Sequence, residues 1–238
     1  MNTTIASITF RGMLGRRRAL LLLFLPAILL LLALALRVSG NDNLDSGTAV
    51  LATFGLAVLL PLLSLIAGTG VIGPEIDDGQ IMYVLTKPIS RSSVILTKYV
   101  CAVVLVAVFT ALPVWLGGVI ILGPSSDLPP AFAVGALAGG VAYSAVFVAL
   151  AVASRQAVTI GLIYALVWES LVGNFAPGTR TLSIQQWSLS LVDRLTSSST
   201  VEAPVSLPLS LVLLAVVTAG ALALGTARLR TLTLASAD

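Results

Sequence analysis

The sequence of 238 residues contains no histidine and a single cysteine, Cys101. Histidine is the commonest metal ligand and general base, so its absence excludes a His-Glu-x-x-His zinc site and a Ser-His nucleophile. One cysteine cannot form a disulfide within the chain. The Gly-x-x-x-x-Gly-Lys-Ser/Thr loop that binds nucleotide phosphates is also missing. We therefore expect that the chain is not an enzyme and has no catalytic, metal or cofactor site of its own.

Charged residues are scarce as well. They make up 10% of the chain, whereas a soluble domain has about 25%. Hydrophobic residues make up 58%, and the mean hydropathy is +1.06. These values predict an all-α membrane protein, and at roughly 20 residues per crossing the chain has room for about six spans and no separate soluble domain. We expect one transmembrane domain over residues 1–238, with spans at about 19–36, 49–72, 99–122, 131–153, 157–176 and 207–227.

The segment before the first span is basic and contains scattered apolar residues, which predicts a short N-terminal helix at the membrane interface. A basic start followed by an apolar run is also typical of a cleavable signal peptide. That alternative is less favoured because the run is long and further spans follow. Within the fourth span, Gly135 and Gly139 form a small-xxx-small pattern, which allows two membrane helices to approach closely.

The long loop 177–206 contains apolar residues at helical spacing, including Ile184, Trp187 and Leu191, with polar residues between them. This pattern predicts an outer amphipathic helix before the sixth span. It would lie at the membrane interface with Trp187 as its anchor. The alternative, in which the apolar residues of this loop pack on the helical bundle, is about equally consistent with the pattern.

Basic residues predict the orientation of the chain. Most of the 13 lysines and arginines fall in the N-terminal segment, the loop 73–98, the turn 154–156 and the C-terminal tail. The alternate loops contain only Arg37, Arg180 and Arg194. The positive-inside rule therefore places both termini and the loop 73–98 in the cytoplasm, and it explains the net charge of +3 without any nucleic-acid partner. Abundant Ala, Leu and Val with little Lys beside Arg indicates a GC-rich bacterial genome, and we expect the chain in the inner (cytoplasmic) membrane.

Glu169 is the one acidic residue that falls inside a predicted span. A carboxylate in the hydrocarbon region is costly, so Glu169 is a candidate substrate or proton site. It also lies in the outer third of its predicted span, where it could reach the lipid headgroups. A gradient-driven transporter usually has several polar groups at midmembrane, and this sequence offers only this residue.

The stretch 73–98 is the most densely charged part of the chain. Gly73-Pro74 followed by three carboxylates has the chemistry of a helix start, because proline fits the first turn and the helix dipole favours acidic residues there. Pro88 ends this helix, and Ser90 is placed to cap the next one, which runs through Lys98. The stretch therefore predicts a short helix across the cytoplasmic face, a corner, and a helix that enters the membrane.

These residues resemble the cytoplasmic signature of type 2 ABC (ATP-binding cassette) transporter permeases, the exporter-type membrane subunits. In that family a Glu-x-x-x-Gly-Thr segment precedes a Leu-x-x-Pro-Val/Ile-Ser-Arg turn and a lysine that begins the next helix. The chain departs from this pattern at Gln80, where threonine is usual. The matching residues are Glu75, Gly79, Leu85, Pro88, Ile89, Ser90, Arg91 and Lys98.

The resemblance implies that the element after span two is a coupling helix held by a separate ABC ATPase subunit, which binds ATP and Mg²⁺. A second permease chain, identical or different, would complete the transporter. The implied function is export of a hydrophobic or amphipathic solute such as a drug or lipid. The alternatives are a gradient-driven carrier that uses Glu169 and a membrane scaffold that transports nothing. The implied ATPase-coupling residues are Glu75, Ile76, Asp77, Asp78, Gly79, Pro88, Ser90 and Arg91.

Overall fold

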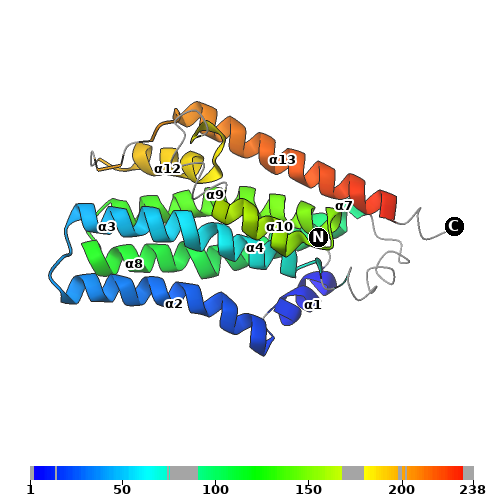
Figure 1. Ribbon diagram of the computed structural model, residues 1–238, viewed down its shortest axis with the longest axis horizontal. Coiled ribbons are helices and arrows are strands. Elements are labelled where there is room, and N and C mark those ends of the chain that lie inside the picture. The colour runs from blue at the N-terminus through cyan, green and yellow to red at the C-terminus, as the bar shows by residue number, and fades with distance from the viewer. Residues whose placement is uncertain are drawn as a thin grey trace.

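The computed structural model describes residues 3–13, 15–73, 75, 91–167, 180–197, 200–201 and 203–232, and none of these residues forms a strand. Long helices lie side by side along one axis of the molecule (Figure 1). For the described residues, the prediction of an all-α fold is confirmed.

Five of the described helices are long and apolar enough to cross a membrane. They correspond to the predicted spans one, two, three, four and six, and their ends differ from the predicted ends by a few residues. The helix of the third span is described from Arg91 onward, in agreement with the predicted helix that follows Ser90 and runs through Lys98. The five helices are Leu20–Val38, Leu44–Gly70, Arg91–Leu122, Leu128–Ala153 and Leu207–Leu229.

Two of these spans contain π-helical segments immediately before a proline. Pro61 and Pro113 each stand in the first turn of the α-helix that follows such a segment. Proline has no N–H and clashes with the carbonyl four residues earlier, and the wider π turn accommodates it without ending the helix. The second span comprises α3 (Leu44–Val50), η1 (Leu51–Leu59) and α4 (Leu60–Gly70), and the third comprises α7 (Arg91–Val106), η2 (Ala107–Ala111) and α8 (Leu112–Leu122).

The fifth predicted span is not confirmed. The structure describes α10 (Ala157–Ile163), which belongs to a shorter apolar helix, Ala157–Val167. This described part has about half of the roughly 20 residues that a crossing needs. Residues 168–179 lie outside the described part of the chain, so a sixth crossing stays a prediction.

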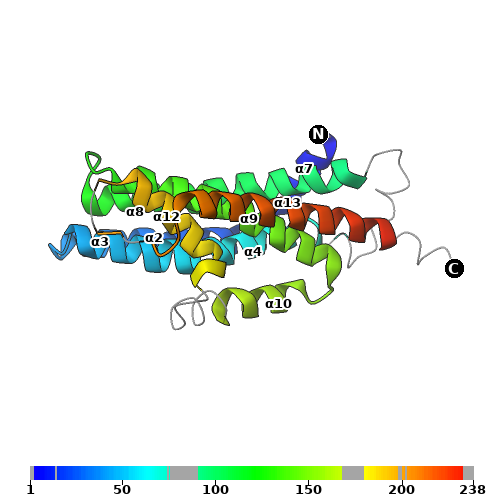
Figure 2. The same ribbon diagram turned by 90° about the horizontal axis from the view of Figure 1, so that it is seen from above.

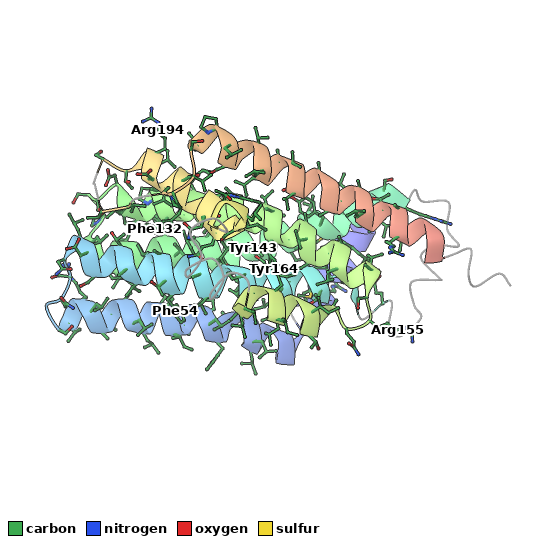
Figure 3. The ribbon with its side chains drawn as sticks, turned by 45° about the horizontal axis from the view of Figure 1, so that its top comes forward. Phe54, Phe132, Tyr143, Arg155, Tyr164 and Arg194 are labelled. Atoms are coloured by element: carbon green, nitrogen blue, oxygen red, sulfur yellow. The ribbon has the colours of Figure 1, made fainter. Side chains whose placement is uncertain are left out.

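The helix α9 (Leu128–Ala153) is the centre of the bundle and packs against α4, α7, α8, α10, α12 and α13. Its large side chains Phe132, Tyr143 and Phe147 have no exposure to solvent. The rings of Tyr143 and Phe147 stack with centroids 6.0 Å apart, and the ring of Tyr164, just after α10, meets Phe147 edge-on at 6.3 Å. Figure 2 shows α9 among its neighbours, and Figure 3 labels Tyr143 and Tyr164, the two tyrosines that contact Phe147.

The predicted amphipathic helix of the outer loop exists as α12 (Ile184–Leu195), and the side chain of Ser183 caps it. Of the two alternatives for this segment, the packing of its apolar residues on the helical bundle is confirmed. Trp187 is only 3% exposed, and its indole Nε1 donates a hydrogen bond to the carbonyl of Thr181 at 2.9 Å. This tryptophan is therefore part of the protein core and not a membrane anchor, because α12 packs against α9 and α13 (Figure 1).

The close approach of α12 to α9 depends on the two glycines of the small-xxx-small pattern. A Cβ atom added at Gly135 would lie 2.7 Å from Val192 Cγ2 and 3.0 Å from the carbonyl oxygen of Ser188, and one at Gly139 would overlap the hydroxyl of Ser188. Gly139 lies about 16 Å along α9 from Leu128 at 1.5 Å per residue. Because α12 reaches this depth, it lies inside the bundle, and the predicted close contact is confirmed.

The predicted N-terminal helix is observed as α1 (Thr3–Met13). Met13 is buried and its sulfur lies against Gly70 at the end of α4, whereas Ile8 is 61% exposed. The helix α2 (Arg16–Val38) follows and continues through Pro26. The position of α1 at a membrane interface stays a prediction.

Candidate functional site

The charged side chains of the described residues gather at the two ends of the bundle. One end, which we name the basic end, carries Arg11 on α1, Arg91 at the start of α7, Arg155 between α9 and α10, and Arg228 on α13 (Figure 1). Figure 3 shows Arg155 at this end and Arg194 at the other. The opposite end carries most of the described carboxylates together with two arginines. These residues are Arg37, Asp42, Asp45, Asp127, Asp193 and Arg194.

Lys98 is the charged side chain at the basic end with the most unusual environment. It lies inside α7 and has no exposure to solvent. Its ammonium Nζ donates one hydrogen bond to the carbonyl of Val71 at 2.6 Å and another to Oε1 of Glu75 at 2.6 Å. A buried ammonium is tolerated when it is paired and hydrogen-bonded, and Lys98 meets both conditions.

The helical geometry of α7 and the end of α4 explain how these groups meet. Lys98 falls at helical spacing from Val94, Ala102 and Leu105, which are all buried, so it points to the bundle interior. Val71 follows the last residue of α4, where helix carbonyls lack intrahelical partners. Lys98 supplies such a partner.

The hydrogen bond from Lys98 holds one carboxylate oxygen of Glu75, Oε1. Its side chain is 23% exposed, and its second oxygen, Oε2, is buried and has no hydrogen-bond partner among the described residues. The ion pair connects Glu75, just after α4, to the middle of α7, where Lys98 lies. We name Val71, Glu75 and Lys98 the lysine clamp.

The lysine clamp joins the two flanks of the stretch in which sequence reasoning placed the ATPase-coupling residues. Of those residues the structure describes Glu75 and Arg91, and Arg91 is the first residue of α7. Ile76, Asp77, Asp78, Gly79, Pro88 and Ser90 lie outside the described residues, and so does Glu169. Their proposed roles stay predictions.

Lys98 belongs to the residues that match the permease signature, but the predicted ATPase-coupling residues do not include it. A signal for it was available, because a lysine at spacing i+4, i+7 and i+8 with apolar residues falls on the buried face of a helix. The acceptor Val71 could not be found in this way, since it uses its backbone carbonyl, which every residue carries.

The opposite end is held by polar contacts of its own. Arg37 Nη1 donates to Asp42 Oδ2 at 2.7 Å and to the carbonyl of Ile121 at 3.2 Å. The backbone N–H of Ser197 donates to Asp127 Oδ2 at 2.7 Å, and this hydrogen bond lowers the pKa of Asp127 below its usual value. These contacts connect loops to helix ends and leave the lysine clamp as the buried charge pair of the described chain.

The role that the described site can play is mechanical, because it connects the end of α4 to α7. In the part of the chain that the structure describes, no three His, Cys, Asp or Glu side chains lie together as a metal site would require. A buried ion pair between the end of α4 and α7 fixes their relative position without providing a nucleophile or a general base.

Comparison with known families agrees with this arrangement. The family described as ABC-2 family transporter protein matches residues 14–176, which is more than half of the chain and includes the whole stretch 73–98. No curated protein matches the chain. The chain therefore belongs to the ABC-2 family, as a membrane subunit of an ABC transporter whose ATPase activity belongs to a separate subunit.

Proposed function

We propose that the chain is the permease of an ABC exporter and that the stretch 73–98 is the element on which the ATPase subunit docks. The observation that supports this most strongly is the lysine clamp, in which Lys98 contacts both Val71 and Glu75 at 2.6 Å. A docked segment can move a membrane helix only if the residues at the ends of that segment are rigidly attached to the helix. The lysine clamp provides such an attachment to α4 and α7 together.

In this proposal the partner ATPase binds ATP and Mg²⁺, and its closure pushes on the stretch 73–98. The carboxylates of Asp77 and Asp78 and the backbone at Gly79 contact the ATPase, while Pro88, Ser90 and Arg91 form the corner. Ile76 supplies an apolar contact. The basic end faces the cytoplasm of a bacterial cell, in agreement with its arginines, and both termini lie on that side.

The cargo that we propose is hydrophobic or amphipathic, and a second permease chain, identical or different, completes the pathway. This is supported by the apolar surface of the spans, since the large side chains exposed on α2, α10 and α13 are almost all Leu, Val, Ile or Phe. Export as the direction of transport is supported by the type of permease signature in residues 75–98.

The test is a charge reversal at Asp78 with a matched reversal at the other end of the molecule. Asp78→Arg and Asp193→Arg are each expressed with the ABC ATPase that co-purifies with the wild-type chain in mild detergent. We expect Asp78→Arg to lower ATPase binding by about tenfold, because a charge at an interface is worth about this much. Asp193→Arg, which changes an exposed residue at the opposite end, should bind normally.

Asp78 is a cleaner position for this test than Glu75. A Glu75→Lys change would bring a second cation to Lys98 and disturb folding as well as docking. Unchanged ATPase binding and unchanged ATP-driven efflux of fluorescent amphiphiles from vesicles with Asp78→Arg would contradict the proposal. Ion-driven efflux by the chain alone, abolished by Glu169→Gln, would instead support the gradient-driven alternative.

A further inference from the structure

A groove of about 300 Å³ opens at the basic end between α2, α4 and the turn that joins α9 to α10. Most of its lining is apolar and includes Leu21, Leu65 and Val158, and Ser154 and Arg155 line it as well. It also reaches Gly73, at the start of the stretch 73–98. The groove thus combines a hydrophobic interior with one cation and lies beside the lysine clamp.

The length of α9 indicates that the groove lies where the hydrocarbon core of the membrane meets the lipid headgroups. The helix α9 has 26 residues, so it is about 39 Å long and spans slightly more than the hydrocarbon core. Ser154 and Arg155 follow its last residue, Ala153, and therefore stand at headgroup level. Leu65 is on α4 toward the membrane interior, at acyl-chain level.

Arg155 has the properties of a cation that can bind an anion from outside the chain. Its residue is exposed, and it makes no ion pair with any carboxylate of the described chain. Arg11 on α1 and Arg228 on α13 belong to the same end of the bundle and add to the positive potential there. A guanidinium is well suited to bind phosphate through two parallel hydrogen bonds.

We propose that this groove binds one anionic phospholipid, with its phosphate at Arg155 and one acyl chain along Leu21, Leu65 and Val158. A soluble anion would make no use of the apolar walls, and a zwitterionic lipid would bring its own cation to the arginine. A bound lipid would pack α4 against the α9–α10 turn beside Gly73. Binding of the lipid would therefore stabilise the position of the first residues of the stretch 73–98.

The experiment measures lipid binding to the purified full chain in detergent by native mass spectrometry. Phosphatidylglycerol and phosphatidylcholine with identical acyl chains are titrated onto the wild-type chain and three variants. Arg155→Gln removes the anion contact, and Val158→Trp fills the groove while keeping its charge. Arg11→Gln is the matched control, because it removes an exposed arginine of the same end that does not line the groove. Thermal unfolding without lipid verifies that each variant is folded.

For the wild type we expect phosphatidylglycerol to bind about tenfold more tightly than phosphatidylcholine, with one tight site. Arg155→Gln and Val158→Trp should each abolish this preference, and Arg11→Gln should retain it. Equal binding of the two lipids, or an intact preference in Arg155→Gln, would overturn the proposal. An equal loss in Arg11→Gln would indicate general charge attraction, and displacement by millimolar inorganic phosphate would indicate a soluble-anion site. Either result would also overturn it.

Discussion

Lys98 carries a full positive charge on a side chain with no exposure to solvent, so its burial depends on the two oxygens that it reaches. Removing either member of a buried ion pair leaves the other without compensation, whereas removing both charges can be nearly neutral. The two members of the lysine clamp should therefore behave as a coupled unit. Their coupling can be measured without knowing the cargo.

We predict that Lys98→Met destabilises the chain by about 3 kcal/mol, because the carboxylate of Glu75 is left partly buried without a cation. The double variant Lys98→Met/Glu75→Gln should regain part of this loss, since no lone charge remains. Thermal unfolding in detergent, followed by the fluorescence of the three tryptophans, measures both.

Arg11→Met is the control for this prediction, because it removes an exposed charge and should change stability by less than about 0.5 kcal/mol. The single variant Glu75→Gln completes the comparison: if the double variant loses as much stability as Lys98→Met and Glu75→Gln added together, Glu75 and Lys98 are not coupled. The lysine clamp would then not transmit motion between α4 and α7.

At the scale of elements, the contact between α9 and α12 shows a packing that no hydropathy pattern reveals. The periodicity of residues 184–195 predicted the helix but not its neighbour. Both its apolar residue Trp187 and its polar residues Gln185 and Ser188 are buried. Burial of the polar face follows from the glycines of α9, which let Ser188 approach the α9 backbone.

We predict that Gly135→Ala destabilises the chain by about 1–3 kcal/mol, which is the usual effect of overpacking a core. The added Cβ would lie 3.0 Å from the carbonyl oxygen of Ser188, and a backbone atom cannot rotate away as a side chain can. Gly220→Ala on α13 is the matched control, since a Cβ there has nothing within 4 Å. It should be neutral or slightly stabilising, because alanine favours helices.

Thermal unfolding of the two variants, together with limited proteolysis near Arg194, separates the possible effects. Loss of the α9–α12 contact should make Arg194 more accessible to trypsin in Gly135→Ala. Equal stability of Gly135→Ala and Gly220→Ala would show that α12 can shift outward at no cost, contrary to the tight packing described above.

The sequence predicted well those elements whose formation depends on local composition. Apolar length located the five long helices, and Gly135 and Gly139 indicated a close contact. The fifth predicted span, 157–176, stays a prediction, because its described part ends at Val167. The limit of this approach is the partner of Lys98, which depends on where the end of α4 lies in space, and composition does not specify that position.

At the scale of the whole molecule, the unequal charge of the two ends is the feature that connects fold and function. Arg155 stands at the basic end with the lysine clamp (Figure 3), and the turn between α2 and α3, which contains Asn41, stands at the opposite end (Figure 1). Because basic loops are retained in the cytoplasm, the lysine clamp should face the compartment that contains ATP. This orientation is required by the proposed docking of an ATPase.

Orientation can be tested with single cysteines, because the natural chain has only Cys101, which is buried. In a Cys101→Ala background, Asn41→Cys and Gln156→Cys each introduce one thiol at an exposed position. We predict that a membrane-impermeant maleimide labels Asn41→Cys in intact spheroplasts and labels Gln156→Cys only after permeabilisation. The background variant should remain unlabelled under both conditions. Labelling of Gln156→Cys in intact spheroplasts would place the lysine clamp outside the cell, where no cytoplasmic ATPase could reach it, and would overturn the proposed function.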